Sequence, residues 1–191
     1  MKGTVHYEVK DGVAILTVDN PPVNPLSDGV RAGFVNNIDK AENDPDVLGV
    51  VLTGAGRSFI AGADISEFGK NPDGPGLDEA FRKLEFCSKP VVAAINGSAL
   101  GGGLETALVC NYRIAGPAAF VGLPEVNLGL LPGAGGTQRL PRLVGPAEAL
   151  KMMLTGMHVN AKKALSMGII DQVSDDLIND SIKFIQKVSS E

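Results

Sequence analysis

The stretch that decides the fold is Val91-Val92-Ala93-Ala94-Ile95-Asn96-Gly97-Ser98-Ala99-Leu100-Gly101-Gly102-Gly103-Leu104-Glu105. Its apolar start, 91–96, reads as a buried strand, and residues 106–110 can continue as a helix. Three successive glycines at this junction allow backbone angles and close approaches that a Cβ would forbid. Free amides at the start of the helix can bind an anion or a developing oxyanion. Glu105 falls about one turn into the helix, where the alternative to catalysis is a first-turn acid favoured by the helix dipole.

Length and composition describe one globular domain, which we expect to span residues 1–191. The chain is 44% hydrophobic and 20% charged, so it can bury a substantial core. Its 24 glycines fall in clusters at the ends of predicted strands, which suggests loops shaped around a ligand. The net charge of −5 and the lack of a Lys/Arg-rich run argue against a nucleic-acid partner.

Targeting signals are missing from both ends of the sequence. Residues 1–6 lack the apolar core of a signal peptide, and no run approaches transmembrane length. The last residues, Ser189-Ser190-Glu191, are not a peroxisomal address. Cys87 and Cys110 form no redox motif, which fits a reducing compartment. We therefore expect a cytoplasmic protein with no membrane partner.

Common cofactor and metal motifs are also missing. Residues 133–138 end on Gln where a dinucleotide-binding motif needs glycine, and no Walker-type phosphate loop occurs. Ser98 lacks the preceding glycine of a nucleophile elbow. His6 and His158, the two histidines, stand in contexts typical of structural or exposed residues, and metal-ligand spacing is absent. We expect no metal and no cofactor.

Strands and helices alternate after residue 47, which predicts an α/β fold. The expected strands are 5–9 and 13–18, joined as a hairpin at Asp11-Gly12, then 47–53, 91–96, 112–115, 119–122 and 169–173. The expected helices are 27–42, 65–68 (short), 77–87, 147–154, 160–167 and a final one opened by residues 174–176. Residues 54–64 are expected to be a glycine-rich loop, and 71–76 the most mobile segment.

Glu125 is the second acid in an unusual setting. It follows Leu123-Pro124 in a stretch otherwise free of charge from 115 to 138, so we expect it to be at least partly buried. Burial disfavours the charged form of a carboxyl, and a second acid in the same cavity would disfavour it further. Glu105 and Glu125 could then divide the roles of base and acid. The alternative for Glu125 is a helix or loop cap.

Three segments in order resemble the enoyl-CoA hydratase/isomerase (crotonase) family. They are 58–65, 96–105 and 124–140, and they carry Ala61-Gly62-Ala63-Asp64, Gly101-Gly102-Gly103-Leu104-Glu105 and Pro124-Glu125 with Gly133-Ala134-Gly135-Gly136-Thr137-Gln138-Arg139. The loop at 20–24 and the segment 140–145 look most like the N-terminal hydratase part of multifunctional β-oxidation enzymes. The resemblance implies an α/β spiral of ββα units.

The resemblance also implies a set of roles. The amides of Ala63 and Gly102 would form an oxyanion hole for a thioester oxygen, and Glu105 and Glu125 would be catalytic. The substrate-binding positions would be Ala61, Asp64, Ile65, Gly101 and Gly133, and residues 71–76 would border the acyl chain. Pro25 and Ser66 depart from residues common in the family.

The implied activity is hydration of trans-2-enoyl-CoA to 3-hydroxyacyl-CoA in fatty-acid β-oxidation, with the acyl-CoA thioester as the small-molecule partner. Δ3,Δ2-enoyl-CoA isomerisation on the same site is the first alternative, and a non-catalytic acyl-CoA-binding module is the second. The chain stops about where the family's C-terminal helical segment begins, so its oligomer is left open between a homotrimer and docking to a dehydrogenase domain.

Overall fold

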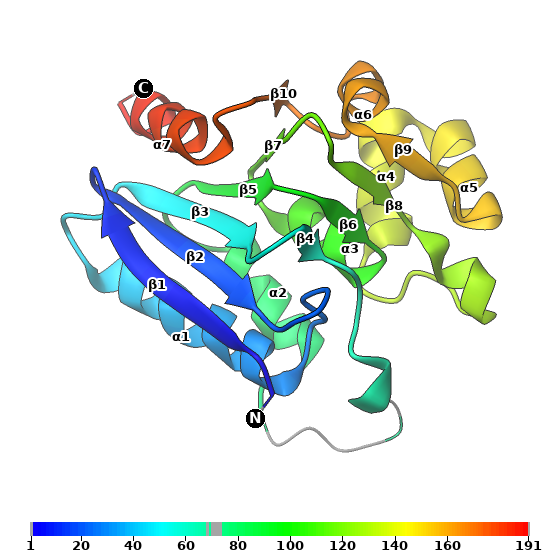
Figure 1. Cartoon of the computed structure of the whole chain (residues 1–191), viewed down its shortest axis with the longest axis horizontal. Coiled ribbons are helices and arrows are strands. Elements are labelled where there is room, and N and C mark those ends of the chain that lie inside the picture. The colour runs from blue at the N-terminus through cyan, green and yellow to red at the C-terminus, as the bar shows by residue number, and fades with distance from the viewer. Residues whose placement is uncertain (1, 68, 70–73, 191) are drawn as a thin grey trace.

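The backbone winds through repeated turns, each with a strand in a large sheet, a short strand in a second sheet and then a helix. The computed structural model describes residues 2–67, 69 and 74–190 (Figure 1). The strands are β1 (Thr4–Lys10), β2 (Val13–Asp19), β3 (Gly49–Gly54), β4 (Ser58–Ile60), β5 (Val91–Ile95), β6 (Ser98–Leu100), β7 (Tyr112–Ala115), β8 (Phe120–Gly122), β9 (His158–Asn160) and β10 (Gln172–Val173). The helices are α1 (Asp28–Asn43), α2 (Leu77–Glu85), α3 (Gly102–Val109), α4 (Gly136–Val144), α5 (Pro146–Thr155), α6 (Ala161–Met167) and α7 (Leu177–Val188), with short 3-10 helices η1 (Ile65–Glu67) and η2 (Pro124–Leu128).

Two sheets organise these turns. The six-stranded sheet has the order β1-β2-β3-β5-β7-β10, and the four-stranded sheet has the order β4-β6-β8-β9. The β1–β2 hairpin is antiparallel, and the remaining neighbours in the large sheet pair in parallel. The turns β3-β4-α2, β5-β6-α3 and β7-β8-α4 each supply one strand to each sheet. The predicted α/β class is therefore confirmed, and the turns have the predicted ββα form.

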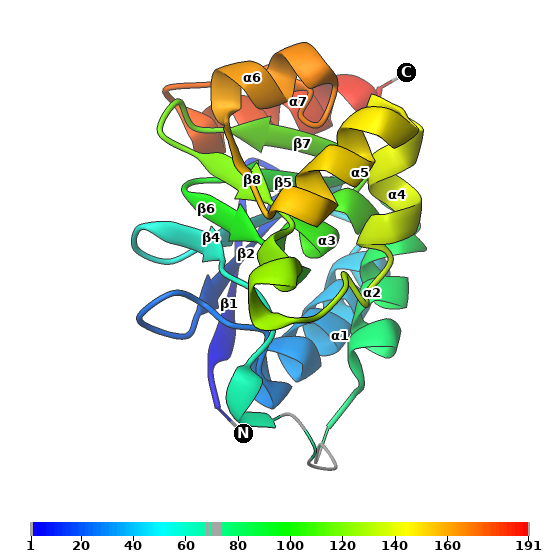
Figure 2. The same cartoon turned by 90° about the vertical axis from the view of Figure 1, so that its right-hand side faces the viewer.

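The central strands of the large sheet are buried on both faces. Along β3, Val50 and Leu52 pack into the main core with helices α1 and α2, whereas Val51 faces the opposite side. There it packs with Ile182 and Ile185 of α7. Figures 1 and 2 show α1 and α2 on one side of the strands and α7 near the other. Burial on both faces explains the continuous apolar runs of β3 and β5.

Successive turns approach each other closely where the two sheets meet α3. A Cβ on Gly103 would lie 1.8 Å from the carbonyl oxygen of Ile60, at the end of β4. Only glycine allows this contact. The contact fixes the start of α3 beside the segment that follows β4, and so brings together two parts of the chain about 40 residues apart.

Most predicted elements are confirmed, and the errors fall on short elements. The structure has the hairpin, the long helix α1, the strands β3, β5 and β7, and α6 with the predicted caps at Asn160 and Gly168. The prediction of a loop over 54–64 was wrong, because β4 lies within it, and β6, β9 and α4 were not predicted. The strand expected over 169–173 is limited to β10. Residues 71–73 of the segment expected to be mobile lie outside the described part of the chain.

Candidate active site

A cavity of about 280 Å³ opens where the first turn of α3, the segment after β4 and η2 meet. Both predicted catalytic acids and both predicted oxyanion-hole residues line it. Its lining is Ala61, Gly62, Ala63, Ile65, Leu100, Gly101, Gly102, Glu105, Pro124, Glu125, Leu128, Leu130, Leu131 and Gly133. Sequence segments 60 residues apart therefore converge on one site.

Glu105 lies in the first turn of α3 and is only 3% exposed. Its Oε1 accepts hydrogen bonds from the amides of Ala134, at 2.9 Å, and Gly136, at 2.8 Å. These donors belong to the loop before α4, so the carboxylate does not cap its own helix. The first-turn alternative thus does not describe this contact. The loop 134–136 instead holds one carboxylate oxygen in place from outside the helix.

The pKa of Glu105 is raised above the ordinary value of 4.5, because burial disfavours the charged form. The amide hydrogen bonds from Gly136 and Ala134 act in the opposite direction, and so does the positive charge of Arg139. The carboxylate is therefore desolvated but has compensating donors. Such a group can remain ionised near neutral pH and accept a proton from water.

Glu125 lies in η2, also in the lining of the cavity, and differs from Glu105 in its partners. Its Oε2 is buried, and among the described residues it has no hydrogen-bond partner. Burial raises the pKa of Glu125, its own backbone amide lowers it, and the negative charge of Glu105 raises it again. A buried carboxyl oxygen without a protein partner is suited to hold a proton or to contact a ligand.

The Glu125 carboxyl group lies close to the glycine turn. A Cβ on Gly101 would lie 3.3 Å from Oε1 of Glu125, and Gly101 has φ of 53°. A side chain at this position would fill the space beside the carboxyl group.

The amides of Ala63 and Gly102 lie beside each other. The position that a Cβ on Gly102 would occupy is 3.4 Å from the amide nitrogen of Ala63. Ala63 bridges to Leu26, but this bridge uses the carbonyl of Gly62, which accepts from the Leu26 amide at 2.9 Å. Within the described part of the chain, neither amide donates to a protein acceptor. Both remain able to bind an oxygen in the cavity.

The other predicted binding residues divide into two groups. Ala61, Ile65, Gly101 and Gly133 all line the cavity. Asp64 is not among the described residues that line this cavity, although its neighbours Ala63 and Ile65 are.

The Asp64 carboxylate is used within the protein. Its oxygens accept from the Ser66 amide at 3.0 Å and from Lys2 Nζ at 3.0 Å, and the side chain is 7% exposed. That Asp64 lines the thioester path stays a prediction. Its alignment within the motif did not reveal the ion pair with the N-terminal segment.

Apolar residues of the lining were missed by the sequence analysis. Leu128, Leu130 and Leu131 lie in the cavity wall and are 62%, 44% and 74% exposed. Three exposed leucines within four positions of a glycine-rich segment are the signal that could have identified them, since such residues often mark a binding surface.

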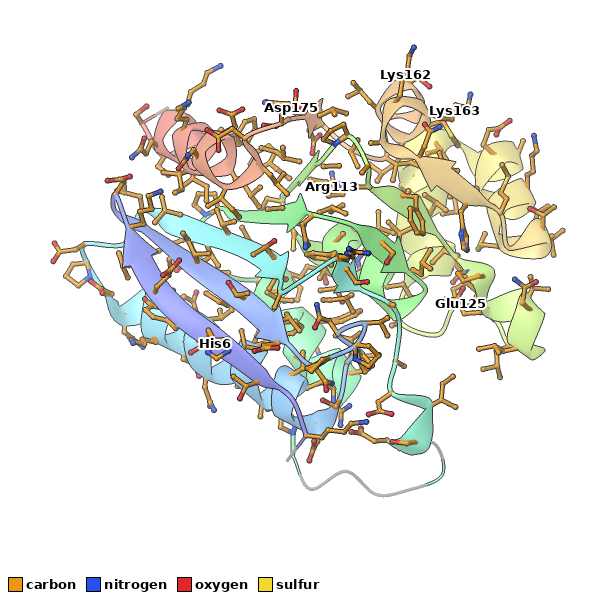
Figure 3. The ribbon with its side chains drawn as sticks, in the orientation of Figure 1. His6, Arg113, Glu125, Lys162, Lys163 and Asp175 are labelled. Carbon is orange, nitrogen blue, oxygen red and sulfur yellow. The ribbon has the colours of Figure 1, made fainter. Side chains whose placement is uncertain are left out.

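The two histidines lie apart from this chemistry, as expected. Figure 3 shows His6 on β1, well away from Glu125. His158 stacks on Phe120 with ring centroids 5.5 Å apart. Among the described residues, no group of three or more His, Cys, Asp or Glu side chains is arranged to hold a metal ion. None of the helices there has both the length and the apolar character needed to cross a membrane.

The cavity thus brings together the four residues predicted as oxyanion hole and catalytic acids: Ala63, Gly102, Glu105 and Glu125. The sequence matches the family model described as enoyl-CoA hydratase/isomerase over residues 8–191. The chain belongs to the enoyl-CoA hydratase/isomerase family, and its fold is the crotonase fold. This is a family of enzymes, and the resemblance drawn from the three sequence segments is confirmed.

Relatives support the same placement. The chain is 53% identical over 170 residues to the peroxisomal bifunctional enzyme of Danio rerio, covering 88% of this chain but 24% of that protein. It is 46% identical over 173 residues to the probable enoyl-CoA hydratase of Bacillus subtilis, covering 87% and 67%. A solved enoyl-CoA hydratase from Bacillus anthracis superposes with a TM-score of 0.88 at 33% identity, covering 100% of this chain and 78% of that one. The chain thus spans about a quarter of its bifunctional relatives, in agreement with the predicted resemblance to their hydratase part.

Proposed function

We propose that this chain hydrates trans-2-enoyl-CoA to 3-hydroxyacyl-CoA. The observation that carries the proposal is that two amides without a described protein acceptor, the buried Glu105 and the half-buried Glu125 all line one cavity. Thioester hydration develops negative charge on the carbonyl oxygen and also needs a base and an acid, so each of these groups has a use. We place the step in fatty-acid β-oxidation because relatives are named for that process.

The amides of Ala63 and Gly102 would bind the thioester oxygen. Attack of water at Cβ moves the electron pair of the double bond toward the carbonyl, so the oxygen gains charge in the transition state. Donors fixed in place before the reaction stabilise this charge without reorganising. Removal of one oxyanion-hole donor in another enzyme raises the barrier by about 2.7–4 kcal/mol.

Glu105 and Glu125 would share the water. Glu105, held by the amides of loop 134–136, would take a proton from the water while the water oxygen bonds to Cβ. Glu125 would deliver a proton to Cα, which completes the addition. One hydrogen of the water stays in the new hydroxyl group, and the other passes to Glu105. Glu105 then loses a proton to solvent and Glu125 takes one up, which restores both carboxyl groups. No step of this mechanism uses a cofactor. That the protein needs none stays a prediction.

Mixing the purified chain with crotonyl-CoA tests the proposal. Hydration removes the conjugated double bond, so the ultraviolet band of the enoyl thioester should disappear and 3-hydroxybutyryl-CoA should form. A chain that binds the thioester without consuming it would support the acyl-CoA-binding module instead. A chain that does neither would refute both functions.

Δ3,Δ2-Enoyl-CoA isomerisation is the second candidate. It needs one carboxyl group to move a proton between two carbons, and the unpartnered Oε2 of Glu125 favours such a shuttle. The double bond moves while no water adds, so a 3-enoyl-CoA substrate would gain the ultraviolet band. Retention of both acids favours hydration as the main activity.

Compartment and assembly stay predictions. The cytoplasmic placement stands beside relatives whose names are peroxisomal or glyoxysomal, and imaging of the tagged chain in its own cells would decide it. Exposed leucines on α5, Leu150 and Leu154, offer an apolar surface for a trimer or for a dehydrogenase domain. Sedimentation of the purified chain would measure the first of these.

A further inference from the structure

Arg139 of α4 lies behind the loop that holds Glu105, on the side away from the catalytic cavity. Its guanidinium forms a fork with Glu85, the last residue of α2. Nε donates to Oε1 at 3.0 Å, and Nη2 donates to Oε1 at 2.8 Å and to Oε2 at 2.7 Å. Such a bidentate pair fixes the plane of the guanidinium as well as its position. Figure 2 shows α2 and α4 along the same side of the molecule.

Ala134 connects this pair to the active site. Its carbonyl accepts from Nη1 of Arg139 at 3.3 Å, and its amide donates to Oε1 of Glu105 at 2.9 Å. One residue of the loop is therefore held from both sides. A shift of the guanidinium would move the Ala134 carbonyl, and with it the amides that orient the Glu105 carboxylate.

Gly135 makes the arrangement sterically possible. It has φ of 98°, and a Cβ at this position would lie 1.9 Å from Nη1 of Arg139. A side chain there would displace the guanidinium. The sequence pattern Gly135-x-x-x-Arg139 is thus required for the charge to lie against the loop.

The loop is also tied to α4 by backbone hydrogen bonds from the amides of Gln138 and Arg139 to the Gly135 carbonyl, at 3.0 and 2.9 Å, and Ala134 packs against the core. A second cavity of about 230 Å³ lies behind the loop, lined by residues 133–135, Arg139 and the α2 residues Leu77, Asp78, Phe81, Arg82 and Glu85. Gly133 lines both cavities, so the loop forms a thin wall between them. Because open space lies behind the wall, the Arg139–Glu85 pair adds to the backbone hydrogen bonds of Gly135 in limiting movement of the loop away from Glu105.

We infer that Arg139 and Glu85 are positioning residues, which hold the 134–136 loop so that its amides orient the Glu105 carboxylate toward the reacting water. The catalytic part of this inference rests on the proposed function, whereas the positioning of Glu105 does not. An ordinary interhelical ion pair is the competing description. It predicts a loss of stability but no change at Glu105.

Three variants separate position from charge. Arg139→Met removes both the clamp and its positive charge, whereas Glu85→Gln weakens the clamp but leaves the charge of Arg139 without its neutralising partner. Lys83→Met is the matched control, because it breaks the Lys83–Asp39 ion pair between α2 and α1 away from the site. The charged groups around Glu105 are Glu125 from η2 and Arg139 from α4, with Asp78, Arg82 and Glu85 from α2 behind the loop.

Nuclear magnetic resonance measures the positioning without any activity. Hydrogen exchange at the Gly136 amide should accelerate by about tenfold in Arg139→Met and in Glu85→Gln, because the loop opens more often. It should stay within about twofold of wild type in Lys83→Met. The Glu105 carboxyl carbon, identified by its absence in Glu105→Gln, should titrate about half a unit to one unit higher in Arg139→Met, and no higher than wild type in Glu85→Gln.

Kinetics with crotonyl-CoA then measure the consequence. We expect kcat to fall about tenfold in both clamp variants with KM nearly unchanged, since a misplaced base affects the chemical step. Arg139→Lys should recover part of this loss. The acid limb of the pH profile should move up in Arg139→Met and should not move up in Glu85→Gln.

Two results would overturn the inference. One is Gly136 exchange within about twofold of wild type in both clamp variants. The other is an active wild type whose kcat is unchanged by both variants. If the wild type does not hydrate the substrate, the proposed function fails, and the exchange and titration data still decide the positioning of Glu105.

Discussion

The two carboxyl groups in the cavity have different surroundings. Glu105 accepts two amide hydrogen bonds from the loop before α4. Glu125 has a buried Oε2 with no hydrogen-bond donor among the described residues, and it is close enough to Glu105 to be affected by its negative charge. Amide donors favour the ionised form, whereas desolvation next to a like charge favours the protonated form. In the proposed function, Glu105 would therefore act as the base and Glu125 as the acid.

Loss of the supported carboxylate should have the largest effect. Glu105→Gln keeps an oxygen to accept from Ala134 and Gly136 but cannot take a proton from water. We expect kcat for crotonyl-CoA to fall by about 10²–10⁴. Glu105→Asp keeps the charge but withdraws it from both amides, and should retain an intermediate rate. A rate near wild type in Glu105→Gln would show that the amide-held acid is not the base.

Removal of an oxyanion donor should come next. Gly102 is the first residue of α3, where proline is compatible with a helix, so Gly102→Pro removes the amide hydrogen. We expect a loss of about 10²–10³ in kcat. Gly102→Ala is the matched control, because it adds a Cβ near Leu26 and Ala63 but keeps the N–H. Equal losses in the two variants would mean that bulk, and not the missing donor, is responsible.

The pH profile of activity should reflect the ionisation of both carboxyl groups. Glu105 must be ionised to act as a base, so activity should fall as pH drops through its pKa, which burial raises above 4.5. Glu125 must be protonated to act as an acid, so activity should fall again as pH rises through its own raised pKa. A bell-shaped profile of kcat/KM is expected, with the acid limb absent in Glu105→Gln. A flat profile from pH 4 to 9 would contradict the assignment of roles.

Stability should respond least. The pKa of Glu125 is higher in the folded chain than in the unfolded one, so the folded form binds more protons and loses stability as pH rises through this window. Glu125→Gln removes that loss. We expect it to be more stable than wild type at pH 8, by no more than about 1 kcal/mol, and equal to it near pH 4. Denaturant titration at both pH values measures this, with the exposed acid variant Glu148→Gln as the control. A Glu125→Gln variant less stable than wild type at pH 8 would show that the carboxylate is not strained there.

Most of the large sheet could be predicted from the sequence, whereas in the second sheet only β8 was predicted. Strands buried on both faces appear as continuous apolar runs, as in β3 and β5. Three-residue strands such as β4 and β6 contain too few positions to show a period, and they exist because tertiary contacts such as Gly103 against Ile60 hold them. The elements that shape the site therefore belong to the part of the fold that local patterns do not encode.

The two candidate catalytic acids could be predicted from the sequence, whereas the ion pairs around the site could not. Glu105 and Glu125 stand out as isolated charges in apolar, glycine-rich segments. By contrast, Lys2 pairs with Asp64 across 62 positions and Glu85 pairs with Arg139 across 54. Such long-range pairing carries no local signature in the sequence. For this reason neither the Lys2–Asp64 ion pair nor the Arg139–Glu85 pair was predicted.

Glu125→Gln is the variant that tests the central claim most directly, measured for both turnover and binding. Calorimetry with butyryl-CoA, which has no double bond to hydrate, should give a Kd within about twofold of wild type, because the amide pair and the apolar lining are unchanged. Crotonyl-CoA turnover should fall by about 10²–10⁴. Turnover equal to wild type would contradict the account, because the carboxyl group assigned to deliver the proton would then be dispensable.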